Sequence, residues 1–218
     1  MKAKRLFTIL LAGFFVLCIA MPAFAAEDYS MLGRYTSNGY ENEYFNYQLN
    51  LPPGNWTLEG RGLFIPVNSD VVTEANKEDT LSFLKSSLDL SFATGFEADS
   101  DYDYVAVTIQ SPGLMNDSWA DEKTIAENSL STVLEDMETA NGADMSVTQI
   151  EGQVDYLDDF IDGKHYCCIY GCLLNDVPYY GIQIYVRSKD EKYLSIIDIQ
   201  SFYPENVEAI ADAFTKLK

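Results

Sequence analysis

Positive charge is scarce in this sequence. The 218 residues include 14 Lys and Arg against 34 Asp and Glu, for a formal net charge of −20 at pH 7. A surface of this sign repels the phosphates of nucleic acids and of anionic lipids. The chain also has no glycine-rich phosphate-binding loop and no basic patch interleaved with aromatic residues. We therefore expect no nucleic-acid partner and interpret the acidic excess as a solvated coat.

Histidine and cysteine are also sparse. The chain has one His, His165, and four Cys, so few side chains are available for acid–base or nucleophilic catalysis. Two carboxylates are able to catalyse glycoside hydrolysis without histidine, but the spacing of the 34 acids singles out no pair. We expect no catalytic residue and no cofactor.

The first 25 residues predict a secretory signal peptide. A basic stretch at residues 2–5 precedes an apolar run at 6–21, and Ala23-Phe24-Ala25 has the small-x-small pattern of a cleavage site. The run is too short to span a membrane, and bulky Leu17 disfavours a lipid anchor on Cys18. We expect cleavage after Ala25, a secreted or extracytoplasmic location, and no stable membrane insertion afterwards.

The remaining chain reads as one domain. It contains no internal repeat, no low-complexity tract and no Pro/Gly-rich linker, and nearly half of its residues are hydrophobic. Residues 26–33 are predicted to be a short flexible lead-in, and residues 34–218 a single domain.

Hydrophobic spacing predicts three main helices. Residues 76–90 and 121–140 carry apolar side chains three and four apart. The third pattern, 204–218, begins with Pro204 in the first turn and ends with Lys216 and Lys218, which suit a helix C-terminus.

Runs of β-branched and aromatic residues predict strands. Four lie at 145–156, 165–174, 178–187 and 192–201, with turn residues between them, so they predict an antiparallel meander. Further strands are expected at 104–109, within 34–60 and at 62–67. The order of elements predicts an α+β fold, in which an antiparallel sheet of about six to seven strands is covered by three main helices.

Two segments carry a resemblance to a known fold family. The opening "YFNYQLNLPPGNW" and the closing "YLSIIDIQSFYPENVEAIADAFTKLK" resemble the start and the end of small secreted domains with the Mog1/PsbP fold. The resemblance implies an α/β/α sandwich that acts as a binding or assembly subunit, and it transfers no functional residue. The acidic loop at 97–103 and the cysteine-rich segment are not part of that pattern.

The segment "GKHYCCIYGC" (163–172) holds His165 and three of the cysteines. On a strand, His165 and Cys167 share one face, while Cys168 and Cys172 share the other at about 13 Å, too far apart for a disulfide. We therefore predict a buried strand with free thiols. A metal site or a hydrolase that uses His165 with Cys167 or with clustered acids remains the alternative.

A second alternative is a weak calcium site. Asp99, Asp101 and Asp103 occupy the first, third and fifth positions of a calcium loop. Tyr104 stands where such loops need Gly, and Gln110 stands where they need Glu. A solvated turn is the favoured interpretation.

One face of the third meander strand offers a candidate binding surface. Tyr179, Gln183 and Tyr185 alternate with aliphatic residues, so they form a contact surface if helices cover only the aliphatic side, and a second core if both sides are covered. Asp198 is an acid within an otherwise apolar strand. We predict an exported, non-catalytic binding or accessory protein of a bacterial extracellular space or cell envelope. Its partner is expected to be an unidentified protein or envelope component.

Overall fold

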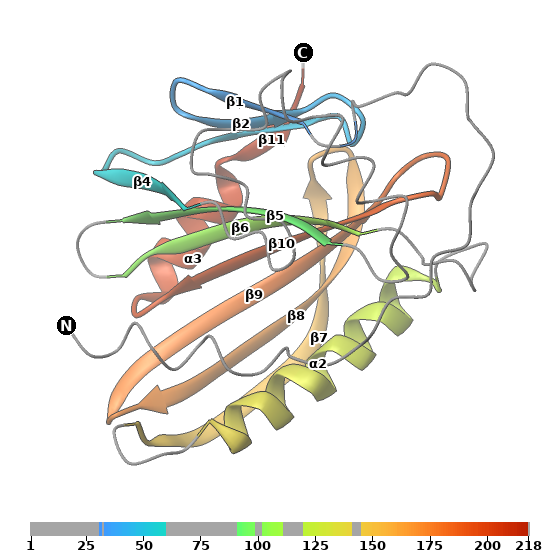
Figure 1. Ribbon diagram of the computed structural model, residues 1–218. Coiled ribbons are helices and arrows are strands. Elements are labelled where there is room, and N and C mark those ends of the chain that lie inside the picture. Colours follow the sequence, from blue (N-terminus) through green and yellow to red (C-terminus); the bar gives the residue numbers. More distant parts are fainter. Residues whose placement is uncertain are drawn as a thin grey trace, which may run out of the picture.

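The computed structural model describes residues 31, 33–59, 91–98, 102–110, 120–140 and 145–217. This part of the chain is built mainly of strands, which form one sheet of seven and one of four (Figure 1). All neighbouring strands are antiparallel. Neither of the helices in the described residues has the length and apolar character needed to cross a membrane.

The larger sheet has the strand order β4-β5-β6-β10-β9-β8-β7. Its strands are β4 (Trp56–Glu59), β5 (Ser91–Ala98), β6 (Tyr104–Gln110), β7 (Val147–Phe160), β8 (Gly163–Leu174), β9 (Val177–Arg187) and β10 (Leu194–Ser201). The last four form the predicted meander. Asn175 and Asp176, between β8 and β9, both have positive φ (52° and 66°), which suits the tight turns of hairpins.

The smaller sheet joins the two ends of the domain. Its order is β1-β2-β3-β11, with β1 (Arg34–Thr36), β2 (Gly39–Asn42), β3 (Tyr47–Asn50) and β11 (Phe214–Lys216). Tyr47 is fully buried, and its hydroxyl lies 2.8 Å from the hydroxyl of Ser195 on β10. The two sheets therefore share one core.

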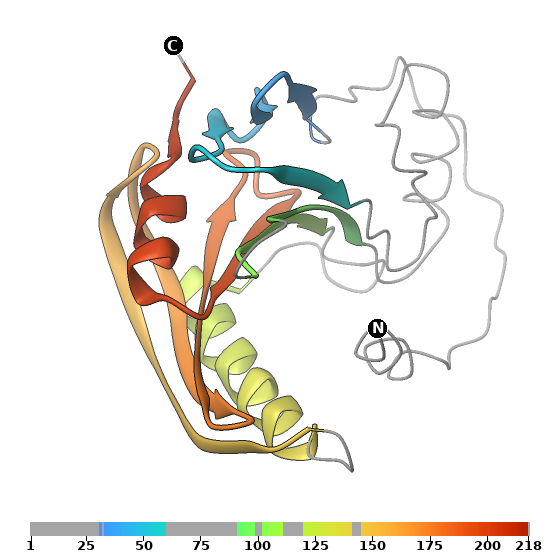
Figure 2. The same ribbon diagram turned by 90° about the vertical axis from the view of Figure 1, so that its left-hand side faces the viewer.

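The two helices, α2 (Glu122–Thr139) and α3 (Pro204–Asp212), pack on opposite sides of the larger sheet (Figure 2). α3 and the smaller sheet lie over the aliphatic side, which contributes Ile182, Ile184, Ile197 and Ile199 to the main core. α2 lies over β7, β8 and β9 and closes a second core around Cys168, Tyr170 and Tyr185.

The predicted helix at 121–140 is confirmed, and its packing explains its sequence. Asp121 caps it, because its carboxylate accepts a hydrogen bond of 3.0 Å from the backbone N–H of Thr124. The helix then approaches β7 very closely at Gly152, where an added Cβ would lie within 3.0 Å of Leu130. The glycine lets the leucine row of α2 rest directly on the sheet.

The predicted α+β sandwich, with three main helices covering one sheet, is wrong. The described residues contain two helices, and a second sheet covers part of the face that helices were expected to cover. This sheet arises because residues 34–50 pair with one another and with the C-terminal segment. The expected helix at 76–90 and strand at 62–67 lie outside the described residues.

The predicted final helix is too long. α3 ends at Asp212, and Phe214–Lys216 forms β11, paired with β3 through Phe214 and Leu49. Phe214 is buried as the helical pattern predicted, but from a strand. An apolar position three or four residues beyond the last buried turn does not distinguish a continuing helix from a strand that reaches the same core.

The acidic loop expected at 97–103 is shorter than predicted. β5 continues to Ala98, and Glu97 is paired with Tyr104 of β6. The alternation of Phe92, Thr94 and Phe96 with small residues in "SFATGFEA" was the overlooked strand signal.

Candidate functional site

The cysteine-rich segment is an extended strand, as predicted. In β8, Cys167 faces the main core and Cys168 faces the core under α2. Cys167, Cys168 and Cys172 are all buried free thiols. Burial raises the pKa of the Cys167 thiol to about 12 and also raises the pKa values of Cys168 and Cys172. Thiols in this state are poor nucleophiles.

His165 lies at the edge of the main core, between two carboxylates. Its Nδ1 is 3.3 Å from Glu122 Oε1 and its Nε2 is 3.2 Å from Asp162 Oδ1. Burial alone would lower its pKa, but the hydrogen bonds and charges of the two acids outweigh burial and raise the pKa above the ordinary 6.5. Both ring nitrogens are thus engaged by carboxylates and not by Cys167, which was the alternative considered for this segment.

Glu122 is also bonded to the sheet. Its carboxylate accepts hydrogen bonds from the backbone N–H groups of Arg187 (3.2 Å) and Tyr166 (3.4 Å). These groups lie beyond Cys167 and Ile184, where the β8–β9 pairing ends. Glu122 therefore accepts hydrogen bonds from strand donors beyond the end of the β8–β9 pairing, and it ties the first turn of α2 to both strands.

We predict that the stabilising contribution of His165 falls with rising pH. Because its folded-state pKa is raised above 6.5, the contribution is fully present below that pH and is lost as the pH rises through the folded-state pKa. Urea unfolding of the wild type and of His165→Gln between about pH 5 and about pH 9 measures this.

The difference in unfolding free energy between the two proteins should shrink toward alkaline pH. Other titrating groups, including Asp198, are common to both and cancel in the difference. A difference that stays constant over the whole range would contradict the ionic role of His165.

The calcium candidates are only partly described. Asp99 and Asp101 lie outside the described residues. Asp103 accepts hydrogen bonds from Ser201 Oγ (2.6 Å) and Asn206 Nδ2 (3.0 Å), and so connects the start of β6 to α3. Over the described ranges, no group of three or more His, Cys, Asp or Glu is arranged to hold a metal ion.

A different set of residues comes together on the α2 side of the larger sheet. We call it the Asp198 cluster: Tyr170, Tyr179, Gln183, Asp198 and Gln200. The Tyr170 hydroxyl donates to Asp198 Oδ1 (3.0 Å), and Gln200 Nε2 donates to Asp198 Oδ2 (2.7 Å). Gln183, opposite Asp198 on β9, also hydrogen-bonds to the carboxylate.

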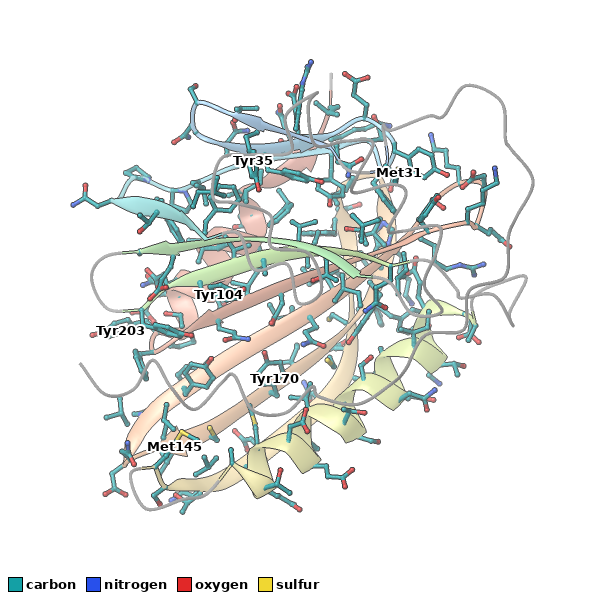
Figure 3. The ribbon with its side chains drawn as sticks, viewed as in Figure 1. Met31, Tyr35, Tyr104, Met145, Tyr170 and Tyr203 are labelled. Atoms are coloured by element: carbon teal, nitrogen blue, oxygen red, sulfur yellow. The ribbon has the colours of Figure 1, made fainter. Side chains whose placement is uncertain are left out.

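Strand register explains why these side chains meet. Gly181 of β9 pairs with both Tyr170 of β8 and Gln200 of β10. Because Gly181 has no side chain, the Tyr170 ring lies across it and reaches Asp198 on β10. Tyr170 is labelled among the side chains of the larger sheet in Figure 3. On the other side of Asp198, β6 presents only Ala106. Asp198 is thus flanked by Ala106 on one side and Gln183 on the other, and it is reached by a tyrosine from two strands away.

The three predicted surface residues differ in exposure. Tyr179 and Gln183 are half-buried, but Tyr185 is fully buried under α2. The Tyr185 hydroxyl donates to Gln183 Oε1 (2.9 Å) and lies 3.3 Å from Cys168 Sγ. The alternative of a second core therefore holds at Tyr185, whereas Tyr179 and Gln183 keep part of their surface exposed.

Toward the end of the sheet, the Asp198 cluster continues into three half-buried aromatic rings, which we call the aromatic end: Tyr102, Tyr179 and Phe202. Their ring centroids are 5.7 to 6.4 Å apart. Tyr203, next in the chain, is 43% exposed. Tyr179 donates its hydroxyl to Gln200 Oε1 and so links the rings to Asp198. This end of the sheet combines aromatic surface with a polar interior.

Burial raises the pKa of Asp198 to about 6, although hydrogen bonds from Tyr170, Gln200 and Gln183 oppose the increase. At neutral pH the carboxylate is therefore largely ionised. Among the described residues, no Lys, Arg or His forms an ion pair with it.

The sequence pointed to Asp198, Tyr179 and Gln183 but not to Tyr170, Gln200 or Glu122. Tyr170 and Gln200 gave no signal, because tyrosine and glutamine are ordinary on two-faced strands. Glu122 was indistinguishable from the other acids near a helix start. The glycine at 181, within an otherwise bulky strand, was the one available clue to a close approach from a neighbouring strand.

Comparison with known proteins adds no constraint. No protein-family model matches this chain, and no curated protein sequence matches it. The resemblance to the Mog1/PsbP fold therefore stays a prediction, and the site must be interpreted from its own chemistry.

Proposed function

We propose that this protein is an exported, non-catalytic binding or accessory protein, and that its ligand contacts the aromatic end and the adjoining Asp198 cluster. The observation that carries the proposal is the presence of three half-buried aromatic rings joined through Tyr179 and Gln200 to a half-buried carboxylate. Aromatic surface beside a few fixed polar groups is typical of ligand sites.

The state of the other reactive groups supports binding over catalysis. The three described thiols are buried with raised pKa values. The sole histidine directs both ring nitrogens at carboxylates that fix it between α2 and the β7–β8 hairpin. Nucleophilic attack and proton transfer both need a group that reaches the substrate.

The test is ligand-observed NMR on the wild-type protein with a panel of small amines, sugars and short peptides. Binding by at least one class should be lost in Tyr179→Ala, because that substitution removes a ring and its link to Gln200. The matched control is Tyr156→Ala, which removes a 43% exposed tyrosine on β7.

Two outcomes would contradict the proposal. One is a panel in which Tyr179→Ala and Tyr156→Ala have the same effect on every ligand. The other is chemical conversion of a bound ligand at a rate that scales with protein concentration, which would indicate an enzyme.

A further inference from the structure

Three side chains of the Asp198 cluster use all of their polar hydrogens in hydrogen bonds within the cluster. Tyr179 donates to Gln200, Tyr170 donates to Asp198, and the Gln200 amide nitrogen donates to Asp198 (2.7 Å) and to the Tyr170 hydroxyl (3.3 Å). Two hydroxyl hydrogens and both amide hydrogens are thereby used inside the cluster. The hydrogen-bonding capacity that these three donors leave open consists of acceptor lone pairs on Asp198 and Gln200.

The open acceptor oxygens of Asp198 and Gln200 favour ligands that carry hydrogen-bond donors. A ligand carboxylate, phosphate or carbonyl would find no remaining donor on Tyr170, Tyr179 or Gln200, whereas an N–H group would find oxygen atoms. The net charge of −20 also repels anions from the surface and attracts cations.

The negative charge of Asp198 indicates that the donor group of the ligand is a cation. It is a half-buried carboxylate whose described partners are all neutral: two amides and a hydroxyl. Burying part of a charged group without a counter-ion has an unfavourable desolvation free energy. A cation bound beside the carboxylate offsets part of this penalty. Ala106, beside Asp198 on β6, bears only a methyl group, whereas the Tyr170 ring fills the space over Gly181 on β9.

The aromatic end supplies the second half of a cation site. The centroids of Tyr102, Tyr179 and Phe202 lie within 6.4 Å of one another, and all three rings are half-buried. The faces of such rings attract ammonium groups and also pack against the alkyl chain that carries one.

We propose that the Asp198 cluster and the aromatic end together bind a small primary alkylamine in its ammonium form. The ammonium group donates to Asp198 and to Gln200 Oε1, and the alkyl chain packs on the aromatic end. This assignment rests on the proposed function, because it names the ligand class for the same surface.

The test uses n-pentylammonium as the probe and uncharged 1-pentanol as its control, with the full chain and isothermal titration calorimetry. Pentylammonium is expected to bind at least about tenfold more tightly than pentanol, because hydrogen bonds between charged groups are stronger than those between neutral groups. Asp198→Asn should remove most of that preference. The matched control is Glu151→Gln, which neutralises an exposed acid on β7.

A pH series on the wild type keeps the test independent of how Asp198→Asn folds. Pentylammonium affinity should fall as the pH is lowered through about 6, where Asp198 gains a proton, while pentanol affinity stays constant. Equal affinity for the two probes, an Asp198→Asn variant that keeps the preference, or no pH effect would each overturn the assignment.

The experiments distinguish an error in the ligand class from an error in the proposed function. If pentanol binds as well as pentylammonium and Tyr179→Ala abolishes both, the ammonium assignment is wrong and the binding surface stands. If neither probe binds, the ammonium assignment is wrong, and the wider ligand panel with Tyr179→Ala decides whether the surface itself is a binding site.

Discussion

Replacing Glu122 with alanine is expected to destabilise the protein by about 3 kcal/mol. The substitution leaves two backbone N–H groups, those of Tyr166 and Arg187, and one nitrogen of His165 without their carboxylate. The Glu122 side chain is only 16% exposed, so water replaces it poorly. Urea unfolding followed by circular dichroism gives the loss of unfolding free energy.

Glu127→Ala is the matched control on the same helix. Glu127 is 54% exposed and, within the described residues, forms an ion pair with Lys123 at 3.5 Å, so its loss should cost less than about 0.5 kcal/mol. Similar losses in the two variants would mean that Glu122 does not act as an acceptor for the strands.

The second large effect is expected from Gly181→Ala, with a loss of about 3 kcal/mol. A Cβ at this position would lie less than 3.0 Å from the ring and the hydroxyl of Tyr170. Tyr170 is 4% exposed and hydrogen-bonded to Asp198, so it moves only by breaking that bond. Thermal and urea unfolding of the variant measure the cost.

Gly163→Ala serves as the control, because no atom lies within 4 Å of its added Cβ. The cause is tested by repeating Gly181→Ala in a Tyr170→Ala background, where the overlap is gone and the extra cost should largely disappear. If Gly181→Ala lowers the unfolding free energy of Tyr170→Ala as much as it lowers that of the wild type, the strain does not arise from the Tyr170 ring.

Both predictions concern the α2 side of the larger sheet. Glu122 fixes the beginning of α2 to β8 and β9, and Gly181 lets Tyr170 reach β10 from β8. The Asp198 cluster is therefore held by contacts between elements, and a stability loss at Gly181 should be accompanied by weaker pentylammonium binding. Glu122 lies outside the cluster, so Glu122→Ala should affect stability more than binding.

The local part of the fold could be predicted from the sequence. Residues 121–140 repeat apolar side chains at helical spacing, and four runs between 145 and 201 alternate as strands, so these elements were predicted correctly. The sequence also predicted that Cys167 and Cys168 lie on opposite faces of β8, because neighbouring side chains on a strand alternate, and the two thiols do lie in different cores.

The sequence determined this much by itself because helix periodicity, strand alternation and hairpin turns such as Asn175-Asp176 depend on neighbours in the chain. Only the tertiary structure decided which acids matter. Glu122 meets partners 43 and 65 residues away, and Asp198 meets Tyr170 from 28 residues away. Likewise, Phe214–Lys216 became a strand because β3 offered an unpaired edge. Such pairings depend on sheet order and register, which one chain's local pattern does not specify.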